Sequence, residues 1–287
     1  MATFATSDHL LVIIDPAARQ TDGESVRIAK DVLSAGAAAK VCLPEGPEEF
    51  ARALGRRGSR RPVVIGDDRA LVRAVTLLHR HRELAGCALS VVPVGDAGLA
   101  RSLGVPPGTV AAARAVLDGA ERRLDLLADD SDGVVLGALG IPPAPLRASA
   151  AQPVPAGSGP PWLRTTYRSY RSLVRTLSAR PARLPDTPAA GPARLRIDVD
   201  GETVVDLDQP VEAVSVTPGA AGLARVEVRP LSVGAEATWL RARGRTVTVT
   251  GADFRYRADA VVSGPVRRRT WRVMEGAWGL VVPPTGE

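Results

Sequence analysis

The stretch PVVIGDDRALVRAVTLLHRH, residues 62–81, gives the strongest indication of the fold. It begins with an apolar run typical of a buried strand, and from residue 69 onward it has the spacing of an amphipathic helix. The turn between strand and helix, residues 66–70, reads Gly-Asp-Asp-Arg-Ala. Helix N-terminal amides at such turns often bind phosphate, usually where several glycines let the backbone approach it. With one glycine and two acids, this turn is either a phosphate loop that has lost its phosphate or an ordinary turn.

The alternation of strand and helix seen in this stretch extends through the first 128 residues. We expect strands at residues 10–14, 39–43, 62–66 and 88–94, a loop DPAARQTDG after the first strand, and helices near 23–35, 47–55, 69–83, 95–103 and 109–118. Strands that alternate with helices of about 10–15 residues are typical of a parallel sheet covered by helices on both faces. The sequence therefore predicts a three-layer α/β/α domain over residues 1–128, with any ligand at the carboxyl ends of the strands.

The remainder of the chain, residues 129–287, has a different composition. Residues 142–161 are rich in Pro, Ala, Gly and Ser, which favours a flexible loop. Residues 162–178 predict a helix with four arginines beside its apolar face, which either packs on the following strands or contacts a membrane. From residue 194 onward, short runs of alternating apolar and polar residues lie between Gly and Pro turns. This pattern predicts a second domain built as an antiparallel β-sandwich or open barrel.

The charge balance of the chain is basic, with a net charge of +6 and a pI near 10.1. Basic proteins often bind nucleic acid or anionic membranes. Here, however, all but two of the 37 basic residues are arginine, and asparagine is absent, which fits a protein encoded by GC-rich DNA. The charges are also not gathered in a basic tail, so we expect no binding to nucleic acid.

Common catalytic motifs and membrane segments are missing from the sequence. It contains no GxGxxG, Walker A, HExxH or GxSxG pattern, and its three histidines and two cysteines have no spacing typical of metal ligands, so no metal site is predicted. The first residues lack the basic start and long apolar run of a signal peptide. No apolar stretch approaches the roughly 20 residues of a membrane span. We therefore expect a soluble, cytoplasmic protein.

Five segments carry the motifs of a known enzyme family. They are GDDRA at 66–70, PVGDAGLARSLGVP at 93–106, AVLDGAERRLDL at 115–126, DAV at 259–261 and EGAWGLVVP at 275–283. In order, they resemble the GGDGT turn, the PLGTGNDFARxLGIP loop, the helix with its DL strand, the DGE turn and the last strand of the diacylglycerol kinase catalytic domain family. This family includes bacterial lipid kinases and sphingosine kinases. The resemblance extends over nearly the whole chain.

The resemblance implies a reaction, its cofactors and its site residues. It implies that ATP with Mg²⁺ donates a phosphoryl group to a lipid alcohol such as a diacylglycerol or a sphingoid base, with peripheral contact at the inner membrane surface. Asp259 matches the general base, which accepts the proton of the lipid hydroxyl, and Asp68 and Asp125 match residues that organise Mg²⁺ and its water. The positions that would lie at the nucleotide are Asp15, Gly66, Asp67, Asp68, Arg69, Gly95, Asp96 and Asp125. A homodimer is left open.

Several positions depart from the family pattern where the chemistry takes place. Asp67 and Arg69 replace the second and fourth residues of GGDGT, both glycine in the family, and Asp67 would repel a triphosphate. Arg69 either pairs with phosphate instead or forms an ion pair with Asp67. The family's Asp-Asp-Gly-Leu, linked with metal binding, corresponds to residues 220–223, Ala-Ala-Gly-Leu. We therefore expect a lipid kinase relative with weak or lost activity, a pseudoenzyme candidate. The alternative is a non-catalytic regulatory relative that binds lipid or nucleotide.

Overall fold

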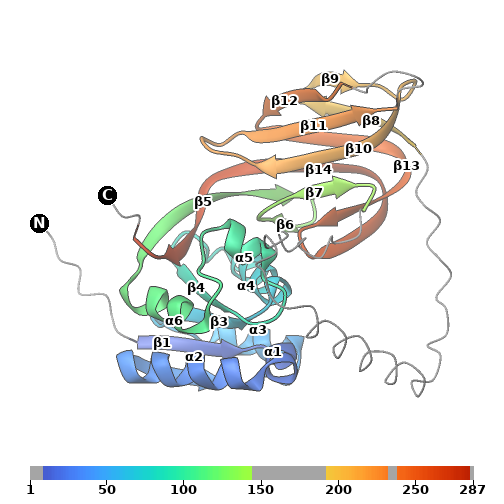
Figure 1. The fold of residues 1–287 in the computed structure, drawn as a ribbon. Helices are drawn as coiled ribbons and strands as arrows, with labels where there is room; N and C mark the ends of the chain where they lie inside the picture. The colour runs from blue at the N-terminus through green and yellow to red at the C-terminus, as the bar shows by residue number, and fades with distance from the viewer. Residues whose placement is uncertain (1–8, 144–191, 232–237, 285–287) are drawn as a thin grey trace, which may run out of the picture. The chain divides into compact units, whose positions relative to one another are not determined.

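The computed structural model describes residues 9–143, 192–231 and 238–284 (Figure 1). The predicted helix at 162–178, and all but two residues of the predicted loop at 142–161, lie outside these ranges. Within the described part of the chain, no helix is both long and apolar enough to cross a membrane.

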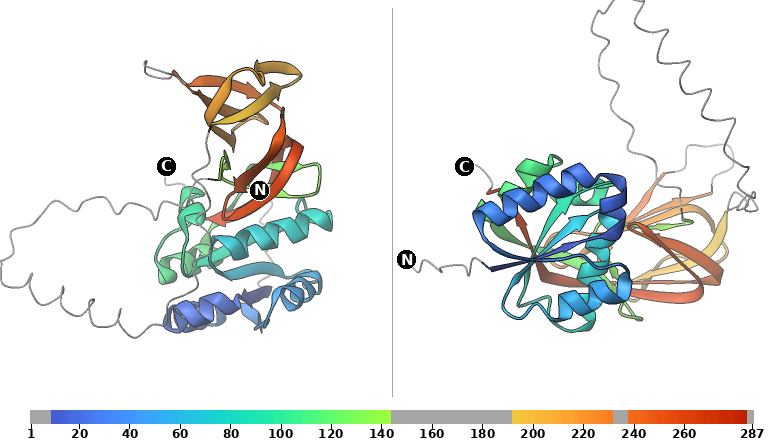
Figure 2. Two further views of the ribbon diagram at one scale, coloured as in Figure 1. Left: turned by 90° about the vertical axis from the view of Figure 1, so that its right-hand side faces the viewer. Right: turned by 90° about the horizontal axis from the view of Figure 1, so that it is seen from below.

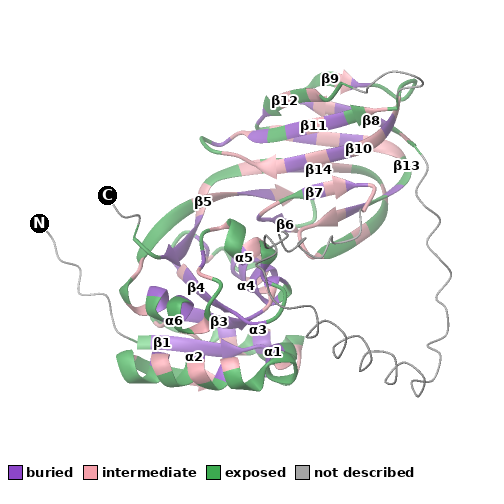
Figure 3. Cartoon of the chain, viewed as in Figure 1, coloured by how far each residue is buried: buried purple, intermediate pink, exposed green. Residues whose placement is uncertain are grey.

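Four parallel strands form the first part of the structure. They are β1 (His9–Ile14), β2 (Ala38–Cys42), β3 (Arg61–Gly66) and β4 (Ala88–Pro93), in the order β2-β1-β3-β4. Their register is parallel throughout, with Val12 beside Val63 and Val63 beside Ser90. All but the first residue of β1, β3 and β4 is buried, as Figure 3 shows, because helices cover both faces of these strands.

The helices around these strands lie close to their predicted positions. They are α2 (Gly23–Gly36), α3 (Pro47–Gly55), α4 (Asp68–Arg80), α5 (Gly98–Ser102) and α6 (Thr109–Asp118). Helix α2 packs against α6, and α3 against α4. Figure 2 shows the strands between helices on either side. Sequence periodicity alone is sufficient to place these elements because each helix has one buried face.

One expectation for this region is wrong. The stretch DPAARQTDG was expected to be a loop, but α1 (Pro16–Thr21) begins inside it. Asp15 caps this helix, since its carboxylate accepts a hydrogen bond of 2.9 Å from the Ala17 amide. Pro16 then occupies the first helical position, where its missing N–H costs nothing.

The remaining strands pair antiparallel with one another, as predicted for those after residue 194, and the last of them in addition pairs in parallel with β4. They are β5 (Ala120–Asp129), β6 (Val134–Val135), β7 (Leu139–Ile141), β8 (Ala193–Val199), β9 (Glu202–Val205), β10 (Pro210–Pro218), β11 (Ala224–Pro230), β12 (Leu240–Gly244), β13 (Thr246–Ala258) and β14 (Val261–Val282). Strands β7 and β8 each pair with both β10 and β13. These four strands therefore close into a ring of pairs, whereas a sandwich would have two separate sheets.

Strand β14 connects the antiparallel strands with the parallel ones. It pairs with β13 along its first half, with β5 along its second half, and with β4 at Gly279 and Leu280. The described residues contain two hydrophobic clusters, and β14 contributes Trp271 to one and Trp278 to the other. The end of the chain thus packs with the first 128 residues although the sequence placed it in the second domain.

Candidate functional site

The turn between β3 and α4 is the first part of the candidate site. Gly66 ends β3, and Asp67 caps α4 by accepting a hydrogen bond of 3.0 Å from the Ala70 amide. A Cβ at Gly66 would lie 2.7 Å from the Cβ of Ala70 and 3.1 Å from that of Asp15. The glycine is therefore required by close packing of this turn against the end of β1.

Asp68 connects this turn to the next strand end. Its carboxylate accepts hydrogen bonds of 2.7 Å from the Leu99 amide and 2.9 Å from the Ala100 amide, both in the first turn of α5. Its own amide donates to the Asp96 carbonyl at 2.9 Å. Burial raises the pKa of Asp68, and the charges of Asp96 and Asp67 add to this effect, although the two amides oppose it.

The remaining residues of the two turns are more open to solvent. Arg69 is exposed and makes no ion pair within the described chain. The ion pair with Asp67, one of the two alternatives for Arg69, is therefore not formed, because the Asp67 carboxylate accepts a hydrogen bond from the Ala70 amide. Gly95 has a φ of +95°, which favours glycine, and the site of its missing Cβ is 3.6 Å from the Cβ of Asp67. Asp96 next to it is exposed.

Asp15 lies at the end of β1, beside Gly66. Besides capping α1, its buried carboxylate accepts a 2.6 Å hydrogen bond from the guanidinium of Arg73 on α4. The same guanidinium lies 5.5 Å from the ring centre of Phe50. Both oxygens of the Asp15 carboxylate thus accept hydrogen bonds from groups of the protein itself. No sequence motif pointed to Arg73 as one of the donors.

Asp259 is at the turn between β13 and β14, with a φ of +49°. Its carboxylate accepts hydrogen bonds from three successive amides, those of Leu136 at 2.7 Å, Gly137 at 2.8 Å and Ala138 at 2.9 Å. Burial raises the pKa of Asp259, and the nearby charge of Asp68 raises it further, while the three amides oppose the shift. The structure therefore brings Asp68 and Asp259, the predicted base, close enough to interact.

Gly137 allows the backbone to pack closely against both Leu99 and Asp259. A Cβ built on it would lie 2.6 Å from Cδ1 of Leu99 and 3.1 Å from Oδ1 of Asp259. The backbone of residues 136–138 thus lies between the first turn of α5 and the Asp259 carboxylate. Sequence reasoning missed this segment, although its composition, LGALG at 136–140, is a signal of close backbone contact.

Asp125 has different partners from the other candidates. Its carboxylate accepts hydrogen bonds of 2.9 Å from the Gly222 amide and 2.7 Å from the Gly276 amide. Both glycines have positive φ, +69° and +53°. Asp125 thus holds two backbone segments: the turn at 220–223, which replaces the family's Asp-Asp-Gly-Leu, and the irregularity within β14 at Gly276. Within the described residues, no three His, Cys, Asp or Glu side chains are arranged to hold a metal ion.

Comparison with known proteins shows which solved structures share this fold. No protein-family model matches the chain, and no curated protein matches it. Three solved structures from Bacillus anthracis str. Sterne do match. Two, each described as a "putative diacylglycerol kinase", have TM-scores of 0.66 and 0.67 at 15% and 14% identity, covering 96% of this chain and 98% of theirs. The third, described as a diacylglycerol kinase, has a TM-score of 0.65 at 13% identity, covering 96% and 97%. The likeness shows that the fold is shared.

Proposed function

We propose that this chain, which has the fold of those structures, is a diacylglycerol-kinase-like protein whose transfer of a phosphoryl group from ATP to a lipid hydroxyl is weak or lost. One observation carries the proposal: a carboxylate of the chain accepts a hydrogen bond from an amide at the turn where phosphate would bind. Asp67, which replaces a glycine of the family's GGDGT turn, accepts this hydrogen bond from the Ala70 amide of α4. A phosphate loop requires such amides to face its ligand.

The charges around the β3–α4 turn also argue against phosphate binding. A carboxylate at a helix N-terminus stabilises the helix by about 0.3–1 kcal/mol. A triphosphate would have to displace Asp67 from the Ala70 amide and then lie beside carboxylates of like charge, those of Asp67, Asp68 and the exposed Asp96. Arg69 is the single cation among residues 66–70, so it offsets at most one of these three negative charges. Binding of a nucleotide phosphate is therefore expected to be weak.

The residues expected to serve Mg²⁺ and the reaction are also engaged elsewhere. Each oxygen of Asp125 accepts one backbone amide hydrogen bond, and those of Asp259 accept three in total. Asp259 therefore orders the backbone of residues 136–138. The arrangement is a poor fit for Mg²⁺ with ATP, because amide hydrogen bonds already fill two of the about four acceptor sites of Asp125 and three of those of Asp259.

A second candidate function is lipid binding without catalysis. Val261 and Val262, the first two residues of β14 and two and three residues after Asp259, are each 45% exposed. Exposed apolar residues on both faces of a hairpin end favour contact with an apolar ligand or partner that encloses it. In this function, the surface beside Asp259 would contact the acyl chains of a lipid alcohol, and the chain would regulate rather than catalyse.

Calorimetry with Mg-ATP tests the proposal. The parent protein is expected to show no binding at millimolar Mg-ATP, whereas Asp67→Gly combined with Arg69→Gly exposes the α4 amides and should give measurable affinity. Asp22→Gly, which removes the matching cap of α2, serves as the control and should bind no nucleotide. A ligand present at a concentration of 100 times its dissociation constant stabilises the folded state by about 2.7 kcal/mol. Thermal unfolding with and without Mg-ATP therefore provides a second readout.

Two results would overturn the proposal. One is tight Mg-ATP binding by the parent protein together with phosphorylation of diacylglycerol in mixed vesicles. The other is a double variant that folds but binds Mg-ATP no better than the parent, which would show that Asp67 and Arg69 never limited the affinity. Co-sedimentation with diacylglycerol vesicles in the absence of nucleotide distinguishes the second candidate function, which requires binding there.

A further inference from the structure

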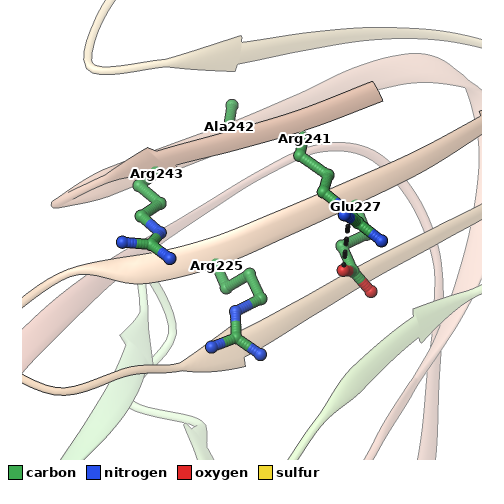
Figure 4. Close-up of a pocket in the computed structure, with 5 residues that line it drawn as sticks. All are labelled: Arg225, Glu227, Arg241, Ala242 and Arg243. Carbon is green, nitrogen blue, oxygen red and sulfur yellow. Dashed lines mark ion pairs between the residues drawn. The ribbon is translucent and has the colours of Figure 1, made fainter. Parts of the chain in front are cut away.

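A pair of arginines lies on the hairpin of β11 and β12, among the antiparallel strands. Arg225 and Arg243 are direct partners across this antiparallel pair, and both are exposed. In Figure 4 their side chains extend the same way from neighbouring strands. Partners in an antiparallel pair project to the same face and lie close together, so the two positive charges are neighbours.

Among the residues that the structure describes, these two arginines have no carboxylate partner, unlike two others on or beside this hairpin. Arg229 pairs with Glu212 at 3.0 Å, and Arg241 pairs with Glu227 at 3.4 Å. Within the described chain, neither Arg225 nor Arg243 makes an ion pair. Like charges placed directly opposite each other destabilise a sheet. The hairpin therefore retains an unfavourable pair that an anion would relieve.

A hollow on the surface lies at the pair. Its volume is about 520 Å³, and it is lined by Arg225, Glu227, Arg241, Ala242 and Arg243. The Arg241–Glu227 ion pair is neutral, so the lining has a net charge of +2 from Arg225 and Arg243. Thr217 of β10 is the cross-strand partner of Arg225 and adds a hydroxyl on the same face.

We propose that this hollow is a binding site for a phosphate monoester, either free or carried on a lipid headgroup. A phosphate monoester carries a charge of about −1.5 to −2 at neutral pH, which matches the net charge of the lining. Each guanidinium can donate two parallel hydrogen bonds to phosphate oxygens, a geometry for which arginine is suited. The site uses no residue of the β3–α4 turn or of the Asp259 turn, so it does not depend on the proposed kinase-like function.

Another role for these charges would be to protect an edge strand. Strand β12 is at the end of the strand order, and charged side chains on an edge discourage pairing with other chains. Protection of an edge requires no ligand. The two roles therefore differ in whether phosphate binds.

The test compares the parent protein with a double variant of the full chain that carries Arg225→Gln and Arg243→Gln. Inorganic phosphate is titrated by calorimetry at constant ionic strength. The parent protein should bind, and the double variant should lose about tenfold or more in affinity, because it lacks both charged donors. Arg255→Gln combined with Arg268→Gln is the matched control. It removes the same charge at two exposed arginines that are not cross-strand partners and should change the affinity less than twofold.

Vesicles distinguish the two sources of the phosphate group. Co-sedimentation with phosphatidylcholine vesicles is measured with and without phosphatidic acid, whose headgroup is a phosphate monoester. Vesicle binding that requires phosphatidic acid and is lost in the Arg225/Arg243 variant would show that the site binds a phosphate group on a lipid headgroup. Binding of inorganic phosphate without binding to these vesicles assigns it to a free phosphate compound.

Other results would overturn the proposal. They are an absence of binding to both probes, equal binding by the parent and the Arg225/Arg243 variant, and an equal loss in the control variant. Thermal unfolding in phosphate-free buffer shows whether the variant is folded, and there its melting temperature should equal or exceed that of the parent, because repulsion between the two arginines is removed. A variant that is less stable and aggregates would instead support protection of the edge.

Discussion

Carboxylates that bind backbone amides account for most of the candidate site. Asp68 and Asp259 each accept several amide hydrogen bonds, yet the pKa of each is raised because burial outweighs those bonds. Asp129 is the contrasting case. Burial raises its pKa too, but hydrogen bonds from Ser131 and Gly133 outweigh burial and lower it overall. The pKa values of aspartates in the same chain are therefore shifted in opposite directions, depending on whether burial or hydrogen bonding is the stronger effect.

The first prediction concerns Asp259 and pH. Because its pKa is raised above the ordinary value of 3.8, the folded state holds this proton more tightly than the unfolded state does. The contribution of Asp259 to the free energy of unfolding therefore falls as the pH rises from below 3.8 to its folded pKa. Urea unfolding at a series of pH values should show the parent losing stability relative to Asp259→Asn across that range.

Asp129→Asn is the control for this prediction and has the opposite sign. Since the folded pKa of Asp129 is lowered, its contribution is complete above the unfolded pKa and is lost as the pH falls through the folded one. The parent should therefore lose stability relative to Asp129→Asn as the medium becomes more acidic. If the two variants had the same pH dependence, the assigned environments of both carboxylates would be wrong.

At the scale of the elements, the junction of α4 with α5 is held by one side chain. Asp68 belongs to the first turn of α4, and its carboxylate accepts hydrogen bonds from the Leu99 and Ala100 amides in the first turn of α5. Helix α5 has five residues, and its N-cap, Ala97, has no side chain that could accept a hydrogen bond from the helix amides. So short a helix has little intrinsic stability, and its position depends on Asp68.

The second prediction follows from this junction. Asp68→Ala leaves the Leu99 and Ala100 amides without their acceptor, and each buried unsatisfied group costs about 1–3 kcal/mol. We expect a loss of about 2–4 kcal/mol in the free energy of unfolding, together with faster hydrogen exchange at those two amides. Asp67→Ala removes an ordinary N-cap and should cost about 1 kcal/mol without affecting α5. Equal costs for the two variants would contradict this role of Asp68.

At the scale of the described structure, β14 makes the two hydrophobic clusters interdependent. Its 22 residues are hydrogen-bonded to β13, β5 and β4 in turn. Trp271 is fully buried in one cluster, and Trp278, at 1% exposure, is buried in the other. A strand shared in this way cannot be released from one cluster without disturbing its pairing in the other.

The third prediction is that both clusters unfold in one transition. Trp271→Ala and Trp278→Ala should each lower the free energy of unfolding by about 3–5 kcal/mol. Each should move a single urea transition seen alike by circular dichroism and by fluorescence of the remaining tryptophans. Trp239→Ala, at a position 42% exposed, should change stability by less than about 0.5 kcal/mol. Two separate transitions, with each variant affecting one, would contradict the prediction.

Local patterns were enough to predict the α/β elements, because burial of one face imposes a period of 3.6 residues on a helix, and burial of both faces makes a strand apolar throughout. The same patterns predicted antiparallel strands after residue 194, and short motifs pointed to a fold that the solved structures share. They did not predict α1, which depends on the cap at Asp15.

Only the tertiary structure decided which groups meet at the candidate site. The approach of Asp259 to Asp68, the amides of residues 136–138, and the partners of Asp125 all join segments at least 97 residues apart. The pairing of Arg225 with Arg243 depends likewise on the register of two strands. Such contacts leave no periodic trace in the sequence. A carboxylate free to bind a metal ion and one held by backbone amides are both written Asp, and only folding determines which groups donate hydrogen bonds to it.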